Sequence, residues 1–262
     1  MTTELDTVLP LYEGKMGNIY DHRSASFVGI GDTDIAPNHN HSSSAVVLPR
    51  YWISPGLTEQ RHERRSWGTQ SAMLGFRRVA RNTDERTCIA AVLPWGASSY
   101  GWILSAGPSA ESLAFLCAQY NSFCFDYTLR QFLTQPSVPQ GTFEQLPTVT
   151  RQAAEDLDLG IGGTFAWVVA QCVRLSATDE KLATWAAECG CADAPYEWDL
   201  SRRITIRAEL DAAFFHLYGI ERDDVDYIMD TFPIVKRKDE ADFGEYRTKR
   251  LILEAFDRMA SC

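Results

Sequence analysis

The chain of 262 residues has no run of about 18 apolar residues, the length that a membrane-spanning helix requires. Its first 16 residues contain neither the basic stretch nor the apolar stretch of a secretory signal. The seven cysteines are odd in number and irregularly spaced, which is typical of reduced thiols and not of a disulfide framework. These absences predict a cytoplasmic protein that makes no use of a membrane.

Complete catalytic and cofactor motifs are also absent. There is no Gly-x-Ser-x-Gly elbow, no Gly-Lys-Ser/Thr phosphate loop and no His-Glu-x-x-His pair. His39-Asn40-His41 lies in a Ser/Asn-rich segment without the ββα-metal pattern of HNH nucleases, and Cys189-x-Cys191 lacks the second close ligand pair of a structural zinc site. We therefore expect no catalytic residue, no metal site and no bound cofactor on this chain.

Basic residues are scarce overall and concentrated in one place. The 25 Lys and Arg against 35 Asp and Glu give a net charge of −10, which argues against a protein that coats nucleic acid with its whole surface. Residues 50–86 are the exception, with eight arginines, no lysine and four acidic residues. Arginine presents a planar fork that suits phosphates and guanine edges. A solvated face with Arg–Glu pairs, such as Arg61–Glu63–Arg64, is the alternative interpretation.

The apolar pattern predicts an α+β fold, in which a strand-rich recognition part over residues 1–150 precedes a mainly helical part over residues 151–262. The expected strands are Ala45–Leu48, Thr87–Leu93 and Tyr100–Leu104. A helix is expected after Ser109, whose hydroxyl can cap it. Further helices are expected over Phe165–Leu175, Thr178–Ala187 and Arg207–Tyr218, then from Asp223 or Asp224 to Pro233, and from about Gly244 onward.

The segment from Leu74 to Thr87 has the side chains that read DNA. It contains four arginines, one asparagine and two threonines in 14 residues, directly before a strand that is expected to be buried. Arginine binds guanine, asparagine binds adenine and threonine binds phosphate oxygens. Because Asp84 and Glu85 adjoin Arg86, an internal ion-pair network is the alternative that the sequence leaves open.

An ordered set of stretches runs from residue 9 to residue 259. It comprises Leu9–Met16, Asp21–Arg23, Leu48–Trp52, Arg81–Pro94, Asn121–Tyr127, Phe143–Pro147, Arg207–Gly219, Tyr227–Pro233 and Gly244–Lys249. The set resembles the C-terminal part of large adenine-specific DNA methyltransferases, namely the type IIG restriction–modification enzymes and their relatives in the BREX and DISARM phage-defence systems. The resemblance implies a target-recognition module that positions double-stranded DNA so that an adenine can be flipped into a catalytic pocket.

The catalytic part of that family is not present in this sequence. None of the 11 prolines adjoins another, so the family's Asn/Asp-Pro-Pro-Tyr/Phe loop is absent, as is its S-adenosylmethionine loop. The resemblance therefore implies that S-adenosylmethionine belongs to a missing catalytic domain, and that this chain is no enzyme by itself. The expected partners are double-stranded DNA and a methyltransferase domain or subunit, or other defence-system subunits. A protein-interaction module that docks on such a subunit through the acidic segment 87–199 is the alternative.

Nine residues are the candidate DNA contacts. The main candidates are Arg77, Arg78, Arg81, Asn82, Thr83 and Arg86, and the secondary ones are Lys15, Arg23 and Arg50. We expect salt-sensitive binding to duplex DNA that Arg81→Ala and Arg86→Ala weaken.

Overall fold

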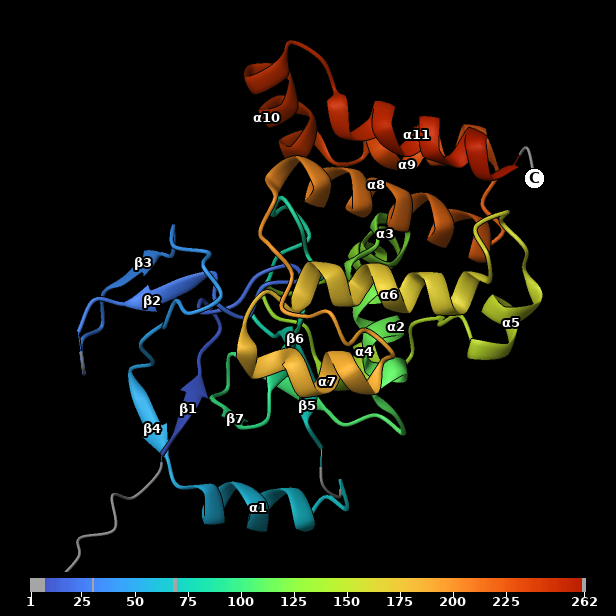
Figure 1. Cartoon of the computed structure of the whole chain (residues 1–262). Coiled ribbons are helices and arrows are strands. Elements are labelled where there is room, and N and C mark those ends of the chain that lie inside the picture. The colour runs from blue at the N-terminus through green and yellow to red at the C-terminus, as the bar shows by residue number, and fades with distance from the viewer. Residues whose placement is uncertain (1–7, 30, 68–69, 261–262) are drawn as a thin grey trace, which may run out of the picture.

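The computed structural model describes residues 8–29, 31–67 and 70–260 (Figure 1). Helices contain 46% of the residues and strands 13%, and the strands all lie in the N-terminal part, so the predicted α+β class is confirmed. No helix in the described ranges is long and apolar enough to cross a membrane.

Eight short strands in the described residues form three small sheets. The central sheet has the order β6-β5-β8 and is antiparallel, with Gly75 of β5 opposite Ala91 of β6 on one side and Leu104 of β8 on the other. A second sheet has the order β4-β1-β7, and β2 pairs with β3. The strands are β1 (Leu9–Tyr12), β2 (Ala25–Phe27), β3 (Ile35–Pro37), β4 (Tyr51–Ile53), β5 (Ala72–Arg77), β6 (Ala90–Pro94), β7 (Ala97–Ser98) and β8 (Trp102–Ser105).

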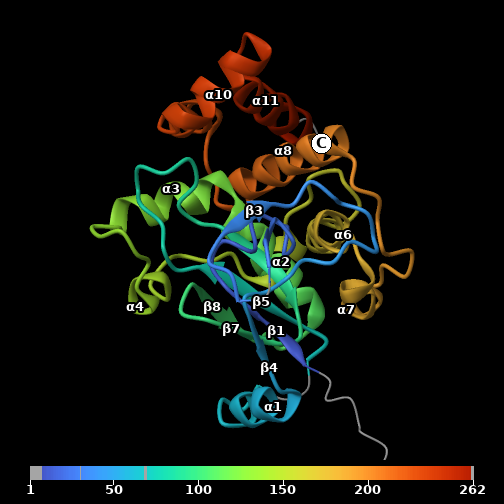
Figure 2. The ribbon, with the colours of Figure 1, turned by 90° about the vertical axis from the view of Figure 1, so that its left-hand side faces the viewer.

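The helices build outward from the central sheet. Helix α2 packs on β5 and β6, α6 on α2, α8 on α6, and α11 on α8. The helices are α1 (Pro55–Glu63), α2 (Ala110–Asn121), α3 (Phe123–Phe132), α4 (Gln140–Phe143), α5 (Arg151–Asp156), α6 (Thr164–Ser176), the 3-10 helix η1 (Glu180–Leu182), α7 (Ala183–Glu188), α8 (Leu200–Leu217), α9 (Arg222–Asp230), α10 (Pro233–Phe243) and α11 (Arg247–Ala260). Figure 2 shows α1 and β4 at one end of the molecule, and α10 and α11 at the other.

Local sequence explains where several helices begin. The hydroxyl of Ser109 accepts the amide of Ser112 at 3.2 Å and caps α2, as predicted. Asp199 caps α8 in the same way, through the amide of Arg202 at 3.0 Å. These side chains satisfy backbone donors that have no partner inside the helix.

The largest hydrophobic core extends from Tyr20 to Met259 and includes side chains of β5, β6, α2, α6, α8 and α11. The division predicted at residue 150 therefore does not coincide with a break in this core. Four helices of the described residues, α1 to α4, also lie before residue 150, on the strand-rich side of that division.

The structure corrects some predicted elements. Residues 45–48 form no strand: Leu48 bonds to the Ser26 hydroxyl and the Phe27 amide next to β2, but no ladder of backbone pairs continues along the segment. Helix α8 begins seven residues before Arg207, at Leu200. Pro233 ends one helix as predicted but also begins the next, since its fixed φ suits the first position of α10. The sequence did not predict α1 or β5.

Candidate nucleic-acid interface

Helix α1 presents an arginine-rich face to solvent. Ser54 caps the helix and Pro55 occupies its first position. Only Thr58 and His62 are buried, and the His62 ring packs on Trp67 and Trp95 with centroid distances of 5.3 and 5.6 Å. Arg61 lies on the exposed side of the helix, and the exposed Arg64 and Arg65 lie in the turn at its C-terminal end.

Arg78 approaches the same region from the opposite side. Its amide donates to the carbonyl of Gly101 at 3.0 Å, and its guanidinium lies 4.0 Å from the centre of the Tyr100 ring. Tyr100 is 69% exposed, so this arginine–aromatic pair lies at the surface. A cation over an aromatic face keeps its charge available to an anion on its other side.

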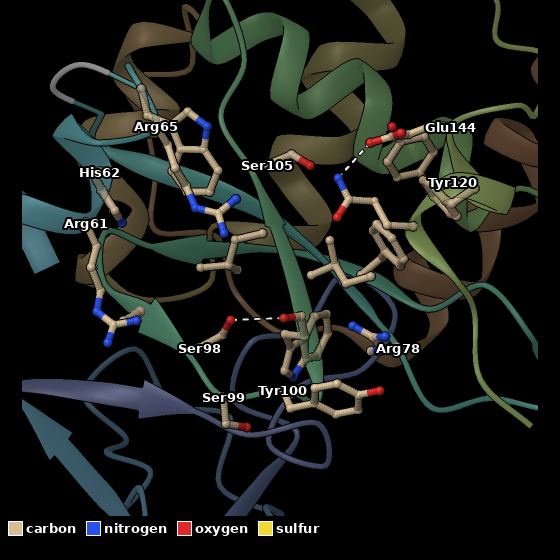
Figure 3. A pocket seen from close by; sticks show the side chains of 18 of the residues that line it. Arg61, His62, Arg65, Arg78, Ser98, Ser99, Tyr100, Ser105, Tyr120 and Glu144 are labelled. Carbon is tan, nitrogen blue, oxygen red and sulfur yellow. Dashed lines mark hydrogen bonds between the residues drawn. The ribbon is translucent and has the colours of Figure 1, made fainter.

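These side chains surround a cavity of about 670 Å³, here called the α1 cavity (Figure 3). Arg61 of α1 and Arg65 of the turn after it line one side, and Arg78 and Tyr100 lie along another. Glu144, across from α1, is the single carboxylate among the described lining residues. Its Oε1 accepts a hydrogen bond from Gln140 at 2.7 Å. The cavity therefore has a positive character.

The arginines of this region lack carboxylate partners. Among the described residues, no ion pair forms at Arg50, Arg61, Arg64, Arg65, Arg77, Arg78 or Arg81. Some exposed arginines elsewhere are paired, since Arg151 pairs with Glu155 at 2.7 Å and Arg250 with Glu254 at 2.8 Å, whereas the exposed Arg202 and Arg237 form no ion pair with the described residues. The alternative of Arg61–Glu63–Arg64 pairing is thus wrong for this part of the chain. The charge of these seven arginines is therefore not neutralised by a carboxylate of the described residues.

The predicted contact segment does not form one surface. Arg77 lines a different cavity from Arg78, and its guanidinium donates to the carbonyl of Gly17 at 2.6 Å. Arg81, Asn82 and Thr83 are exposed in the loop between β5 and β6. The amide of Asn82 donates to the carbonyl of Leu133 at 3.3 Å, which occupies part of its hydrogen-bonding capacity.

Arg86 is corrected from a DNA contact to an internal residue. It is 7% exposed, and its Nε lies 2.7 Å from Oδ2 of Asp126, which is fully buried. The other oxygen of Asp126 accepts from Arg130 at 2.9 Å, and the backbone amide of Thr87 also donates to this carboxylate. The internal-network alternative was therefore right for Arg86, although its partner is Asp126 and not the neighbouring acidic residues.

Arg23 is corrected in the same way. It is 2% exposed and donates to the carbonyls of Ser42, Ala45 and Thr178 at 2.9, 3.1 and 3.2 Å. Its Nε also lies 3.4 Å from Asp179. Burial alone would raise the pKa of Asp179, but the hydrogen bond from His22 and the charges of His22 and Arg23 lower it. Arg23 thus joins an N-terminal loop to the segment after α6 and is not available to DNA.

The other secondary candidates lie at the surface but outside the α1 cavity. Lys15 is exposed in the turn after β1. Arg50 is half-buried, with its guanidinium 4.9 Å from the centre of the Tyr51 ring. Neither residue lines the α1 cavity.

Sequence reasoning missed Arg61, Arg65 and Tyr100 as site residues. A signal was present, because Ser54-Pro55 predicts a helix start and three arginines lie at positions 61–65, near the end of a helix of that length. For Tyr100, no local pattern predicts that Arg78 would cover its ring. Their contact depends on the pairing of β5 with β8.

Comparisons with known proteins leave the family open. A scan against protein-family models, a search of curated proteins and a search of solved structures each found no match to this chain. In the described ranges, no group of three or more His, Cys, Asp or Glu residues is arranged to hold a metal ion.

Proposed function

We propose that the chain is a DNA-binding target-recognition module of an adenine-specific DNA methyltransferase from a restriction–modification or phage-defence system. The observation that supports it most is the α1 cavity, around which Arg61, Arg65 and Arg78 have no carboxylate partner in the described residues. DNA phosphates would supply the missing counter-charge.

The arrangement suits a nucleic-acid backbone in two respects. Arg61 of α1 and Arg65 of the turn that follows α1 line one side of the cavity, and Arg78 faces them across it. The exposed Tyr100 ring adds an aromatic surface beside these charges, on which a base or sugar could pack. Arginine forks bind phosphate with two parallel hydrogen bonds, which fixes orientation as well as affinity.

In this proposal, methyl transfer belongs to a partner. The resemblance assigns S-adenosylmethionine and the catalytic loop to a methyltransferase domain or subunit, and this chain positions the duplex. Because the chain carries a net charge of −10, DNA must approach through the arginine-rich region, and the isolated chain should bind weakly and with strong salt dependence.

The test is fluorescence anisotropy with a labelled duplex at several salt concentrations. The triple variant Arg61→Gln/Arg65→Gln/Arg78→Gln should weaken binding and lower the slope of log K against log salt by about one for each lost phosphate contact. Arg151→Gln is the matched control, because Arg151 is an exposed arginine that already pairs with Glu155 and Glu111.

Two outcomes would contradict the proposal. A folded triple variant that binds duplex DNA as the wild type does would remove the α1 cavity from the interface. Absence of DNA binding by the wild type at low salt, together with a stable complex with a methyltransferase subunit, would favour the protein-interaction alternative.

A further inference from the structure

A second cavity, of about 650 Å³, lies between the N-terminal loops and helix α8, and it is here called the α8 cavity. It shares no lining residue with the α1 cavity. Four arginines line it from distant segments: Arg77 from the end of β5, Arg86 from the loop before β6, and Arg203 and Arg207 from α8. The volume falls in the range of pockets that hold small molecules.

The two arginines of α8 are one turn apart and face the same side of the helix. Arg203 is held in place, since it donates to the carbonyl of Leu175 at 2.5 Å and lies 3.6 Å from the centre of the Trp198 ring. The side chain of Arg207 forms no hydrogen bond and no ion pair with any residue that the structure describes. Two like charges at this spacing oppose one another, so the arrangement has a cost in the empty protein.

The carboxylates of the cavity are engaged elsewhere. Oδ1 of Asp21 accepts the amide of Arg23 at 2.9 Å, and Oδ2 of Asp84 accepts the amide of Arg81 at 2.9 Å. Glu85 pairs with Lys238 at 2.5 Å.

Arg86, the fourth arginine of the wall, is neutralised by Asp126. Arg77, Arg203 and Arg207 therefore have no ion-pair partner in the described ranges, and Nε of Arg77 has no hydrogen-bond partner there.

Partial burial makes these charges costly. Desolvation lowers the pKa of Arg77, and it lowers that of Arg203 to about 10. Desolvation, followed by the nearby charge of Arg86, also lowers the pKa of Arg207. Removing a cation from water without a partner disfavours its charged form, and a bound anion would reverse that effect.

We propose that the α8 cavity binds a phosphate group through Arg77, Arg203 and Arg207. Three guanidinium groups that line one cavity can match the oxygens of a phosphate, and the side chain of Asn18 lies in the same wall, whereas the amide of Asn38 already donates to the carbonyl of Arg23 at 2.9 Å.

The two faces of the nearby Trp198 ring are already covered. Arg203 lies over one at 3.6 Å, and His41 stacks on the ring at 3.8 Å. Trp198 therefore offers no free face to a base, and the site would recognise the anion alone. The phosphate can belong to a small phosphorylated molecule or to a DNA backbone.

The probe is inorganic pyrophosphate, titrated into the full chain by isothermal calorimetry at fixed ionic strength. Arg207→Gln should weaken binding by about tenfold to a hundredfold, which is the effect of one lost charge-assisted hydrogen bond. Arg151→Gln, which alters an exposed arginine outside both cavities that already pairs with Glu155, should bind pyrophosphate as the wild type does. Without pyrophosphate, Arg207→Gln should melt a few degrees higher than the wild type, because an unpaired, half-buried charge is gone.

A second arm with a labelled DNA duplex distinguishes the sources of the phosphate. A loss of pyrophosphate binding in Arg207→Gln with unchanged DNA binding identifies a small phosphorylated ligand. A loss of both identifies a backbone phosphate, and either result supports the site. Arg207→Lys keeps the charge but not the guanidinium fork, so its affinity for pyrophosphate should lie between those of the wild type and Arg207→Gln. It replaces Arg207→Gln in the test if that variant does not fold. Pyrophosphate binding that is absent in the wild type, or equal in all variants, would overturn the proposal without bearing on the α1 cavity.

Discussion

Arg77 and Arg78 are neighbours in the chain, yet their side chains line two cavities that share no residue. The backbone shows why, because the amide of Arg77 donates to Ile89, beside β6, at 2.8 Å, and that of Arg78 donates to Gly101, beside β8, at 3.0 Å. Successive side chains of an extended strand point to opposite faces. The arginine-rich segment therefore supplies two separate sites.

Arg78→Ala and Arg77→Ala should differ in their effect on DNA binding. Arg78 lines the α1 cavity without an ion pair in the described residues, so its loss should weaken binding and lower the salt slope by about one. Arg77 does not line that cavity, so its loss should leave binding there unchanged. Anisotropy titrations of both variants at several salt concentrations check this, and equal effects would contradict the assignment of the two side chains to different cavities.

Arg86→Ala should lower the free energy of unfolding, because Arg86 holds an internal ion pair and does not contact DNA. Removing this arginine leaves the buried carboxylate of Asp126 with Arg130 and backbone amides only, at a cost of about 3–5 kcal/mol. Arg81→Ala, on the exposed loop, should change the free energy of unfolding by less than about 0.5 kcal/mol. Urea denaturation of both variants measures the difference. If Arg86→Ala leaves the free energy of unfolding unchanged, the ion pair of Arg86 with Asp126 does not stabilise the fold.

Acidification should loosen helix α1. Burial lowers the pKa of His62, and the positive charge of Arg65 lowers it further. A hydrogen bond with the backbone of Gly96 raises it, but by less than burial lowers it. The packed histidine is therefore neutral, and the stability it contributes is present above its ordinary pKa of about 6.5 and is lost as the pH falls below that value. Hydrogen exchange over residues 55–66 should speed up, relative to α8, between pH 7.5 and pH 5. His62→Gln, which cannot be protonated, should show no such relative change, and the same pH response in that variant would exclude His62 as the cause.

Asp211 should contribute a pH dependence of stability that is opposite in sign to that of His62, and Asp211→Asn should remove it. Burial raises the pKa of Asp211 to about 6, above its ordinary value of 3.8, although Arg86 and the amide of Phe123 oppose the shift. The stability that this carboxyl contributes is thus full below about pH 4 and is lost as the pH rises through 6.

The asparagine variant keeps an oxygen for the Phe123 amide but does not titrate. The free energy of unfolding of the wild type, relative to the variant, should fall by up to about 3 kcal/mol between pH 4 and pH 8. Parallel curves for the two proteins would show that Asp211 is ionised at the same pH in both the folded and unfolded chain.

Much of the helical part was predictable, because its apolar spacing and caps are local features. The expected helices after Ser109 and over Phe165–Leu175 were confirmed as α2 and α6, and the buried stripe of Val225, Ile228 and Met229 as part of α9. Strand β5 was missed, since its continuous apolar run has no period of two and includes a glycine. The concentration of arginine in residues 50–86 was equally evident from the sequence.

The sequence by itself determined the helical periodicity, the caps and the amount of charge in each segment, because these depend on neighbours a few residues away. Only the tertiary structure decided which charges are free. Arg86 and Asp126 are 40 residues apart, and Thr178, which accepts from Arg23, lies 155 residues after it. Two of the nine predicted contacts are buried by such long-range pairs, whereas Arg61 and Arg65 reach a cavity because α1 lies beside the central sheet. The exposure of an arginine depends on the packing of distant segments, and no local pattern contains that information.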